Sequence, residues 1–388
     1  MNILVRSFPV LLLSVVSALN AFAAGKPAPH YLFTDDDIAG KRTNTTTIYT
    51  IQSNGNLKEK TDIVGGSDGI AGGYFGLNKA VVLKTATEKC LFFTSSASGQ
   101  IAGMVIPSLK IAGIFNGADG DTGAAFGIGL TINASYVYAS FTDANNIGTF
   151  QLQSGCKLQF VSDVNTIGLQ GGAVDGMAVH GNMMVVTYGD GSIQSFDISA
   201  GVPVSNGDEQ NSTGFRGQNY PGGVDITSDG HYAIFGDVAT AAIVEVSDIS
   251  SGKLTKTTLY HLGNALSSAS VFLTPDETML YVANTQSGQM TAAFFDKTTG
   301  KISKGCTSAA LRGFADGWAY LGSVVTQTNT GTGGAVYVTE YGAPSTIGIV
   351  NLTVNGQKCT LKESSASPVA DDDSQGLLSI ATYPPRSF

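Results

Sequence analysis

A repeat of about fifty residues constrains the fold of this chain more than any other feature of its sequence. Each copy reads as an apolar or Gly-rich strand, a tight polar turn, a strand of β-branched and aromatic residues, a Gly/Asp/Asn loop and two further strands. In the two clearest copies, which begin at Gly222 and Ser268, Thr227 aligns with Thr274 in the first turn. Weaker copies begin near Tyr74, Gly123, Gly172 and Tyr320. Helical repeats are disfavoured, because Gly interrupts every helical window.

Four short strands in such a period are typical of one blade of a β-propeller. Divided by this period, the 365 residues after residue 23 give seven blades. The last segment, Gln375–Tyr383, reads as an innermost strand with no blade after it, and His30–Val64 reads as three strands that lack an innermost one. The sequence therefore predicts an all-β fold, a seven-bladed β-propeller closed by pairing of the N- and C-terminal strands in blade one.

The N-terminus has the pattern of an export signal. Arg6 precedes an apolar run over Val10–Val16, and Ala21–Ala23 has the small-x-small pattern of a signal-peptidase site. A membrane anchor would need about 20 apolar residues in a row, and Ser14 and Ser17 interrupt this run. We expect a signal peptide over residues 1–23, a single propeller domain over residues 24–388, no membrane span after cleavage, and a secreted or periplasmic protein.

Four cysteines, an even number, fit two disulfides in an exported chain. The repeat register places Cys156, Cys306 and Cys359 at the start of the outermost strands of blades three, six and seven. Because blades six and seven are neighbours, this register favours the pairs Cys90–Cys156 and Cys306–Cys359. Four free buried thiols are the alternative.

The charged residues are few and mainly acidic. The formal net charge is −9, from 30 acidic and 21 basic residues. An acidic surface repels nucleic acid and anionic lipid. We also expect the protein to be a monomer. In a propeller, the loops that join blades and the loops between second and third strands emerge on one face, which we call the upper face. The register assigns to it Asp35, Asp36, Asp37, Asp68, Asp119, Asp121, Asp143, Asp190, Asp208, Glu209, Asp237, Asp316, Glu340, Asp371, Asp372 and Asp373.

Two triple-aspartate runs stand out among these acidic residues. Asp35, Asp36 and Asp37 are distant in sequence from Asp371, Asp372 and Asp373, yet the register places both runs in loops of blade one. Hard cations prefer clusters of carboxylate oxygens. The runs therefore suggest a Ca²⁺ or other cation site, with a solvated acidic rim as the alternative.

The strand sequences resemble those of secreted YVTN-type and lactonase-type seven-bladed propellers. Residues 280–284 (LYVAN) and 336–340 (VYVTE) are similar to the YVTN core, and 268–277 (SASVFLTPDE) is similar to a lactonase stretch that reads Pro-Arg-His, three apolar or small residues, then Ser-Pro-Asp-Gly. The resemblance implies hydrolysis of a sugar-acid lactone. At the positions of the family's Arg-His pair, however, this chain has Ala269-Ser270, Gly222-Gly223 and Gly172-Ala173.

Two carboxylates remain as candidate catalytic groups in the innermost strands. Asp175 and Asp225 are predicted to occupy the same repeat position in blades four and five, and one could serve as a base if the like charge of the other raised its pKa. Arg216 and Arg312 could anchor an anionic substrate. The alternative is that both carboxylates bind backbone or water.

Three functions follow from these observations. The first is an exported propeller that binds a small molecule, a cation or a partner through its acidic upper face, without catalysis. The second is a lactonase-type hydrolase or isomerase that uses Asp175 or Asp225 with Arg216 and Arg312. The third is a structural module of the cell surface.

Overall fold

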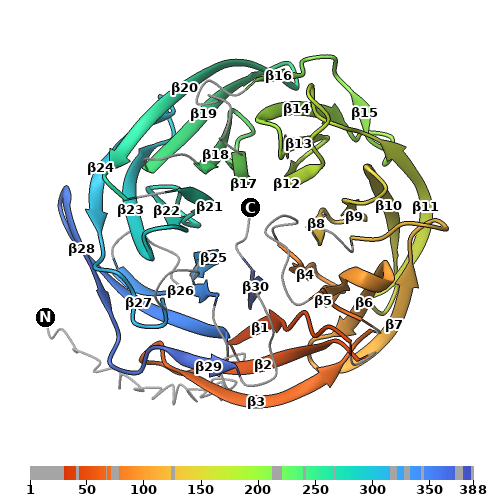
Figure 1. The fold of residues 1–388 in the computed structure, drawn as a ribbon, viewed down its shortest axis with the longest axis horizontal. Coiled ribbons are helices and arrows are strands. Elements are labelled where there is room, and N and C mark those ends of the chain that lie inside the picture. The colour runs from red at the N-terminus through yellow and green to blue at the C-terminus, as the bar shows by residue number, and fades with distance from the viewer. Residues whose placement is uncertain are drawn as a thin grey trace, which may run out of the picture.

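The computed structural model is a ring of seven β-sheets around a common central axis (Figure 1). The structure describes residues 30–40, 43–66, 68–70, 78–123, 127–211, 221–238, 242–265, 267–314, 321–326, 333–341, 345–371 and 379–385. The predicted signal peptide lies outside these residues. Within them, every regular element is a strand apart from one turn of 3-10 helix, η1 (Ser96–Ser98). The predicted all-β, seven-bladed propeller is confirmed.

The strands of each blade follow one another from the central axis outward. Blade one contains β30 (Ser379–Tyr383), β1 (Tyr31–Asp35), β2 (Thr45–Ile51) and β3 (Leu57–Val64). Blade two contains β4 (Ala80–Lys84), β5 (Lys89–Ser95), β6 (Gln100–Val105) and β7 (Lys110–Asn116). Blade three contains β8 (Ile128–Ile132), β9 (Tyr136–Phe141), β10 (Asn146–Gln153) and β11 (Lys157–Asn165). Blade four contains β12 (Val174–His180), β13 (Met183–Tyr188), β14 (Ser192–Asp197), β15 (Val204–Ser205) and β16 (Gln210–Asn211).

The remaining three blades follow the same order. Blade five contains β17 (Pro221–Ile226), β18 (Tyr232–Val238), β19 (Ala242–Ser250) and β20 (Lys253–Gly263). Blade six contains β21 (Ser268–Leu273), β22 (Met279–Asn284), β23 (Gln289–Asp296) and β24 (Lys301–Thr307). Blade seven contains β25 (Leu321–Thr326), β26 (Gly333–Glu340), β27 (Ser345–Asn355), β28 (Lys358–Glu363) and β29 (Val369–Asp371).

The ring closes as the sequence predicts. β30 pairs antiparallel with β1 in five consecutive residue pairs, from Tyr31 opposite Tyr383 to Asp35 opposite Ser379. The innermost strand of blade one thus comes from the C-terminal end of the chain and the other three from the N-terminal end (Figure 1). This pairing covers the inner edge of β1, which would otherwise be unpaired.

The apolar core lies between the sheets rather than at one centre. Each of the seven blade interfaces contains its own cluster of buried side chains. The tyrosines of the YVTN-like segments contribute to this packing: the Tyr337 hydroxyl donates a hydrogen bond to the Gly55 carbonyl of blade one at 2.8 Å. Tyr138 in blade three binds Gly201 of blade four in the same way, also at 2.8 Å. These two tyrosines tie blade seven to an outer turn of blade one and blade three to an outer turn of blade four.

Both predicted disulfides are present. Cys90–Cys156 links blade two to blade three, and Cys306–Cys359 links blade six to blade seven. One detail of the prediction is wrong: Cys306 lies near the end of the outermost strand β24, not at its start, because β24 already begins at Lys301. The predicted disulfide Cys306–Cys359 is nevertheless correct, because β24 and β28 lie on adjacent outer edges of the ring.

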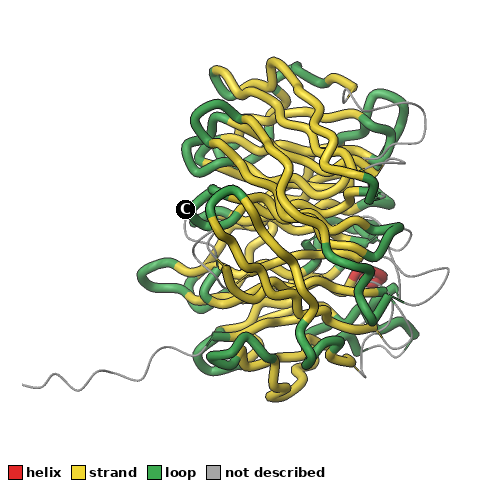
Figure 2. Tube along the Cα trace, turned by 90° about the vertical axis from the view of Figure 1, so that its left-hand side faces the viewer, coloured by secondary structure: helices red, strands yellow, loops and turns green. Residues whose placement is uncertain are grey.

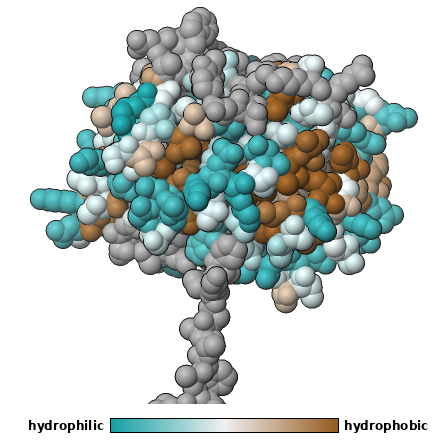
Figure 3. Space-filling view, turned by 90° about the horizontal axis from the view of Figure 1, so that it is seen from below, coloured by the Kyte–Doolittle hydropathy of each residue, from teal (hydrophilic) through white to brown (hydrophobic). Residues whose placement is uncertain are grey.

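Loops emerge on both faces of the ring (Figure 2). η1, which joins β5 to β6, marks the upper face and lies at the right of Figure 2. The outer wall seen in Figure 3 carries hydrophilic side chains with apolar areas between them. On β3, for example, Lys58, Glu59 and Lys60 are exposed.

Candidate functional site

Asp175 is the candidate site residue whose surroundings differ most from those of an ordinary surface carboxylate. It is the second residue of the innermost strand β12, at a bulge in the pairing with β13. Its exposed fraction is 3%, and its Oδ1 has no hydrogen-bond partner among the residues that the structure describes. Burial raises the pKa of Asp175 well above its usual range. The group is therefore a buried acid on an innermost strand, with one oxygen that no described residue binds.

Asp225 does not share the position of Asp175, which corrects the sequence prediction. It is the fifth residue of β17, beyond the bulge of that strand, whereas Asp175 is the second residue of β12. The Leu273 N–H of blade six donates to Asp225 Oδ2 at 2.9 Å, and the Ile226 N–H donates to Oδ1 at 2.9 Å. Asp225 thus connects two neighbouring innermost strands, in agreement with the alternative of backbone hydrogen bonding.

The two predicted arginine anchors do not complete a site with Asp175 in the described part of the chain. Arg312 lies in the connection between blades six and seven, and its Nε is 3.2 Å from Glu363 Oε2 on the outermost strand β28. Its guanidinium also donates to the Ser364 carbonyl. Arg216 lies outside the described residues. The role of Arg216 as an anchor stays a prediction.

The first aspartate run is built into the structure rather than exposed. Asp35 Oδ2 accepts a hydrogen bond from Thr94 Oγ1 of blade two at 2.7 Å, and its Oδ1 accepts one from Asn44 Nδ2 at 2.9 Å. Asp37 forms a buried ion pair with Lys79, with a distance of 3.0 Å between Oδ2 and Nζ. All three aspartates are fully buried. Burial and the neighbouring Asp37 raise the pKa of Asp35 to about 7.

The two aspartate runs do meet, at the interface between blades seven and one. Asp371 ends β29 of blade seven, not a loop of blade one as predicted. The Thr47 hydroxyl lies 3.0 Å from Asp36 Oδ2 and 3.5 Å from Asp371 Oδ1. Burial, with the nearby Asp371, raises the pKa of Asp36 to about 8. Asp372 and Asp373 lie outside the described residues.

The described carboxylates do not gather as a ligand set for a metal ion. Among the residues that the structure describes, one group of three potential ligands lies within 4.8 Å of one another, namely Glu88, Cys90 and Cys156. Its two cysteines form a disulfide and are not available as thiolates. A cation site at the aspartate runs therefore stays a prediction that depends on Asp372 and Asp373.

Other acidic residues of the upper face hold the loops together. Asp190 Oδ2 accepts hydrogen bonds from the N–H groups of Gln170 and Gly172 in the connection between blades three and four, at 2.6 and 3.0 Å. Asp121 accepts one from Asn146 Nδ2 at 2.7 Å. The upper face is thus not simply a solvated acidic rim, because many of its carboxylates are bound by the protein itself.

Two residues that the sequence assigns to the acidic upper face are buried in the structure. Asp237 and Glu340 end the second strands of blades five and seven, opposite the first residues of the innermost strands, Pro221 and Leu321. Both are fully buried. Burial, with the Glu245 charge, raises the pKa of Asp237 to about 7, and burial raises that of Glu340 to about 7. In the repeat alignment Asp237 falls on Asn284, so a polar residue recurring at this repeat position was an available signal.

These buried acids predict a stability that falls as the pH rises. Between the usual pKa near 3.8 to 4.5 and the folded values of about 7 to 8, the folded chain holds protons that the unfolded chain releases. We expect a higher melting temperature at about pH 5 than at about pH 8. Glu340→Gln, which retains an acceptor for the Thr346 hydroxyl, should reduce this difference.

The control for this measurement is Asp248→Asn, at a less buried site on β19. General charge repulsion in a chain of net charge −9 acts on both variants alike. The melting temperatures at pH 5 and pH 8 could differ by the same amount in wild type, Glu340→Gln and Asp248→Asn. That result would contradict a contribution of Glu340 to the pH dependence of stability.

Comparison with known proteins identifies the fold through structure rather than sequence. No protein family model matches the chain, and no curated protein matches it in sequence. A protein of Bacteroides fragilis, provisionally assigned as a 6-phosphogluconolactonase, has a similar structure, with a TM-score of 0.68 and 12% identity over 92% of this chain and 99% of that one. The two proteins therefore share the same propeller fold. A second such protein, from Bacteroides uniformis, has a TM-score of 0.65 and 11% identity over 91% and 99% of the two chains.

A further solved structure shares the architecture without an assigned activity. It is a functionally unknown protein from Desulfotomaculum acetoxidans, with a TM-score of 0.59 and 12% identity over 90% of this chain and 98% of that one. In the described part of this chain, no helix has the length and apolar character that a membrane span requires.

Proposed function

We propose that this protein is an exported propeller that binds a small molecule at the upper end of its innermost strands, beside Asp175. The observation that carries the proposal is the buried carboxyl group of Asp175, whose Oδ1 lacks a partner among the described residues. An unsatisfied buried polar group costs free energy, and such groups are frequent in binding and catalytic sites. A hydroxyl or amine of a ligand would supply the missing hydrogen bond.

Lactone hydrolysis is the second candidate function. It is supported by the fold shared with two provisionally assigned lactonases and by the raised pKa of Asp175. In this reaction the Asp175 carboxylate would accept a proton from water while the water oxygen bonds to the lactone carbonyl carbon. The ring C–O bond then breaks, and the proton passes to the leaving oxygen, giving the open hydroxy acid.

Asp175→Asn tests both candidates in one experiment. The melting temperature of the wild type is measured with each member of a panel of sugar-acid lactones, the corresponding sugar acids, and amines. Hydrolysis of each lactone is measured in parallel. We expect at least one compound to raise the melting temperature of the wild type, and the variant to lose that shift. If the protein is a lactonase, turnover should fall by at least about 100-fold in the variant.

The matched control is Asp197→Asn, an exposed aspartate of the same blade. It should retain the ligand-induced shift. A shift that persists unchanged in Asp175→Asn would reject the binding site, and wild-type turnover in that variant would reject the catalytic role.

The same melting-temperature measurement also tests whether the protein binds calcium. If Asp36 and Asp371 take part in a cation site with Asp372 and Asp373, CaCl₂ should raise the melting temperature and a chelator should lower it. An unchanged melting temperature under both conditions would remove the cation from the proposal.

Export is supported by the two disulfides, which persist in oxidising compartments.

A further inference from the structure

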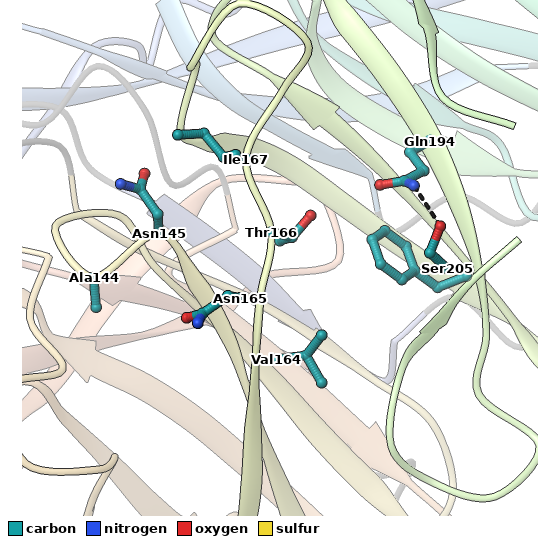
Figure 4. Close-up of a pocket in the computed structure, with 9 residues that line it drawn as sticks. Ala144, Asn145, Val164, Asn165, Thr166, Ile167, Gln194 and Ser205 are labelled. Carbon is teal, nitrogen blue, oxygen red and sulfur yellow. Dashed lines mark hydrogen bonds between the residues drawn. The ribbon is translucent and has the colours of Figure 1, made fainter. Parts of the chain in front are cut away.

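A cavity lies on the outer part of the ring, between blades three and four (Figure 4). Its volume is about 510 Å³. Asn145 from the turn between β9 and β10, Asn165 at the end of β11, and Ile167 from the following connection form one side. Gln194 and Ser205, from β14 and β15 of blade four, form the other. Because these are third- and fourth-strand positions, the cavity is separate from Asp175 on the innermost strand β12.

The split outer edge of blade four helps to form this cavity. Five of the other blades have a continuous fourth strand of seven to eleven residues, for example β20, and blade seven has the six-residue β28 together with the short β29 at the other end of β27. Blade four instead has two two-residue strands, β15 and β16, which pair with opposite ends of β14. Ser205 of β15 is thereby placed opposite Phe196, and both residues line the cavity.

A chain of hydrogen bonds that runs from the buried Tyr188 to the exposed Ser205 fixes the direction of the polar groups. The Tyr188 hydroxyl donates to Gln194 Oε1 at 2.9 Å, so that the Gln194 amide nitrogen is left to donate to Ser205 Oγ at 2.6 Å. The Gly207 N–H also donates to Ser205 Oγ, at 3.0 Å. Since Ser205 Oγ accepts both bonds, its own hydrogen remains available as a donor to a ligand.

Two side-chain amides add further capacity for hydrogen bonding. Among the described residues, the side chains of Asn145 and Asn165 have no hydrogen-bond partner. Each amide offers one acceptor oxygen and two donor hydrogens. A ligand that carries neighbouring groups able both to donate and to accept would satisfy them.

The rest of the lining is uncharged and mainly apolar, and the hydroxyl of its one polar member, Thr166, is hydrogen-bonded to the Tyr188 hydroxyl. Phe196 and Val164 contribute carbon surface, and Ile167 remains 48% exposed although it is a large apolar side chain. None of the lining residues is ionisable. A charged ligand would lose hydration here without gaining an ion pair, and an anion would also be repelled by a chain of net charge −9.

We propose that this cavity binds a neutral saccharide. Sugar hydroxyls both donate and accept, which matches the two asparagine amides and the free hydrogen of Ser205, and the C–H face of a sugar ring matches the apolar surface of Phe196, Val164 and Ile167. The volume falls within the range of about 300–1,000 Å³ that is usual for small-molecule sites. The site does not depend on the proposed function at Asp175.

Titration calorimetry of the full chain tests the proposal. The probes are glucose, galactose, N-acetylglucosamine, maltose and cellobiose, with gluconate and spermidine as charged comparisons. We expect at least one neutral sugar to bind at a single site. Asn165→Ala, and Asn145→Gly, which tolerates the left-handed backbone of residue 145 (φ 51°), should each weaken binding about two- to tenfold.

Ser205→Tyr should fill the cavity and abolish binding, and since Ser205 is exposed the melting temperature should stay near that of the wild type. Asn351→Ala, at an exposed asparagine of β27, and Asp175→Asn should leave sugar affinity unchanged. The proposal is overturned if no neutral sugar binds at about 20 mM, if binding persists in Ser205→Tyr, or if a charged probe competes for the same site more strongly than any sugar.

Discussion

Replacing Lys79 by methionine is expected to destabilise the fold by about 3–5 kcal/mol, because it leaves a buried carboxylate without its counter-charge. The Lys79 and Asp37 side chains are 3% and 0% exposed, with 3.0 Å between Nζ and Oδ2. Lys79 directly precedes the innermost strand β4 of blade two, and Asp37 follows β1 of blade one. Loss of the ammonium group therefore affects the contact between two blades, and the melting temperature should fall by several degrees.

The pH dependence of this variant distinguishes lost charge from lost packing. Lys79 also lowers the pKa of Asp35, although burial and Asp37 dominate and raise it to about 7. Without the lysine, the two carboxyl groups can avoid repulsion by taking up a proton, so the defect should be larger at about pH 8 than at about pH 5.

Lys84→Met is the matched control, since Lys84 is an exposed lysine at the other end of the same strand. It should melt close to the wild type at both pH values. Equal melting temperatures for Lys79→Met and Lys84→Met would show that the buried pair contributes nothing measurable.

Deleting the last strand should have the largest effect of all. A chain that ends at residue 378 lacks β30, and with it five residue pairs to β1 and the buried side chains of Ile380 and Tyr383. Burial of each such side chain contributes about 1.5–3 kcal/mol. The disulfides link blades two to three and six to seven, so neither holds the opened interfaces of blade one. We expect loss of the cooperative thermal transition.

A chain that ends at residue 385 retains β30 and should melt like the full chain. Ile380→Ala, which shortens a side chain that is 2% exposed, should lower the melting temperature while leaving the ring closed. A cooperative transition at the wild-type temperature in the 378-residue chain would show that the ring does not need its terminal pairing.

The architecture could be predicted from the sequence because it depends on local, repeated signals. Turn residues such as Thr227 and Thr274 recur at the period of the blades, and incomplete copies at both ends require the closure between β1 and β30. The disulfide partners followed from the same register, because that register places the paired cysteines in neighbouring blades. An error of several residues in the bounds of β24 did not change which blades were neighbours.

The site could be predicted only in part, because small departures from the repeat decide it. Asp175 lies at the bulge of β12 and Asp225 lies beyond the bulge of β17, and this difference in position is invisible in the residue pattern. Nothing in the residue pattern distinguishes Lys79 from the other basic residues. Its role as the counter-charge of a buried carboxylate depends on Asp37, which lies 42 residues earlier. The cavity between blades three and four depends on the split outer edge of blade four, which the repeat alignment treats as one strand.

The sequence by itself determined the number of blades, their closure and the pairing of the cysteines, because hydrophobic alternation and turn chemistry act over a few residues and repeat along the chain. Only the tertiary structure decided which acidic side chains are buried, which are bound and which retain an unused oxygen. Burial and hydrogen bonding bring together groups as distant as Thr47 and Asp371, which are 324 residues apart. The charge state of a carboxyl group depends on those neighbours and not on its place in the repeat.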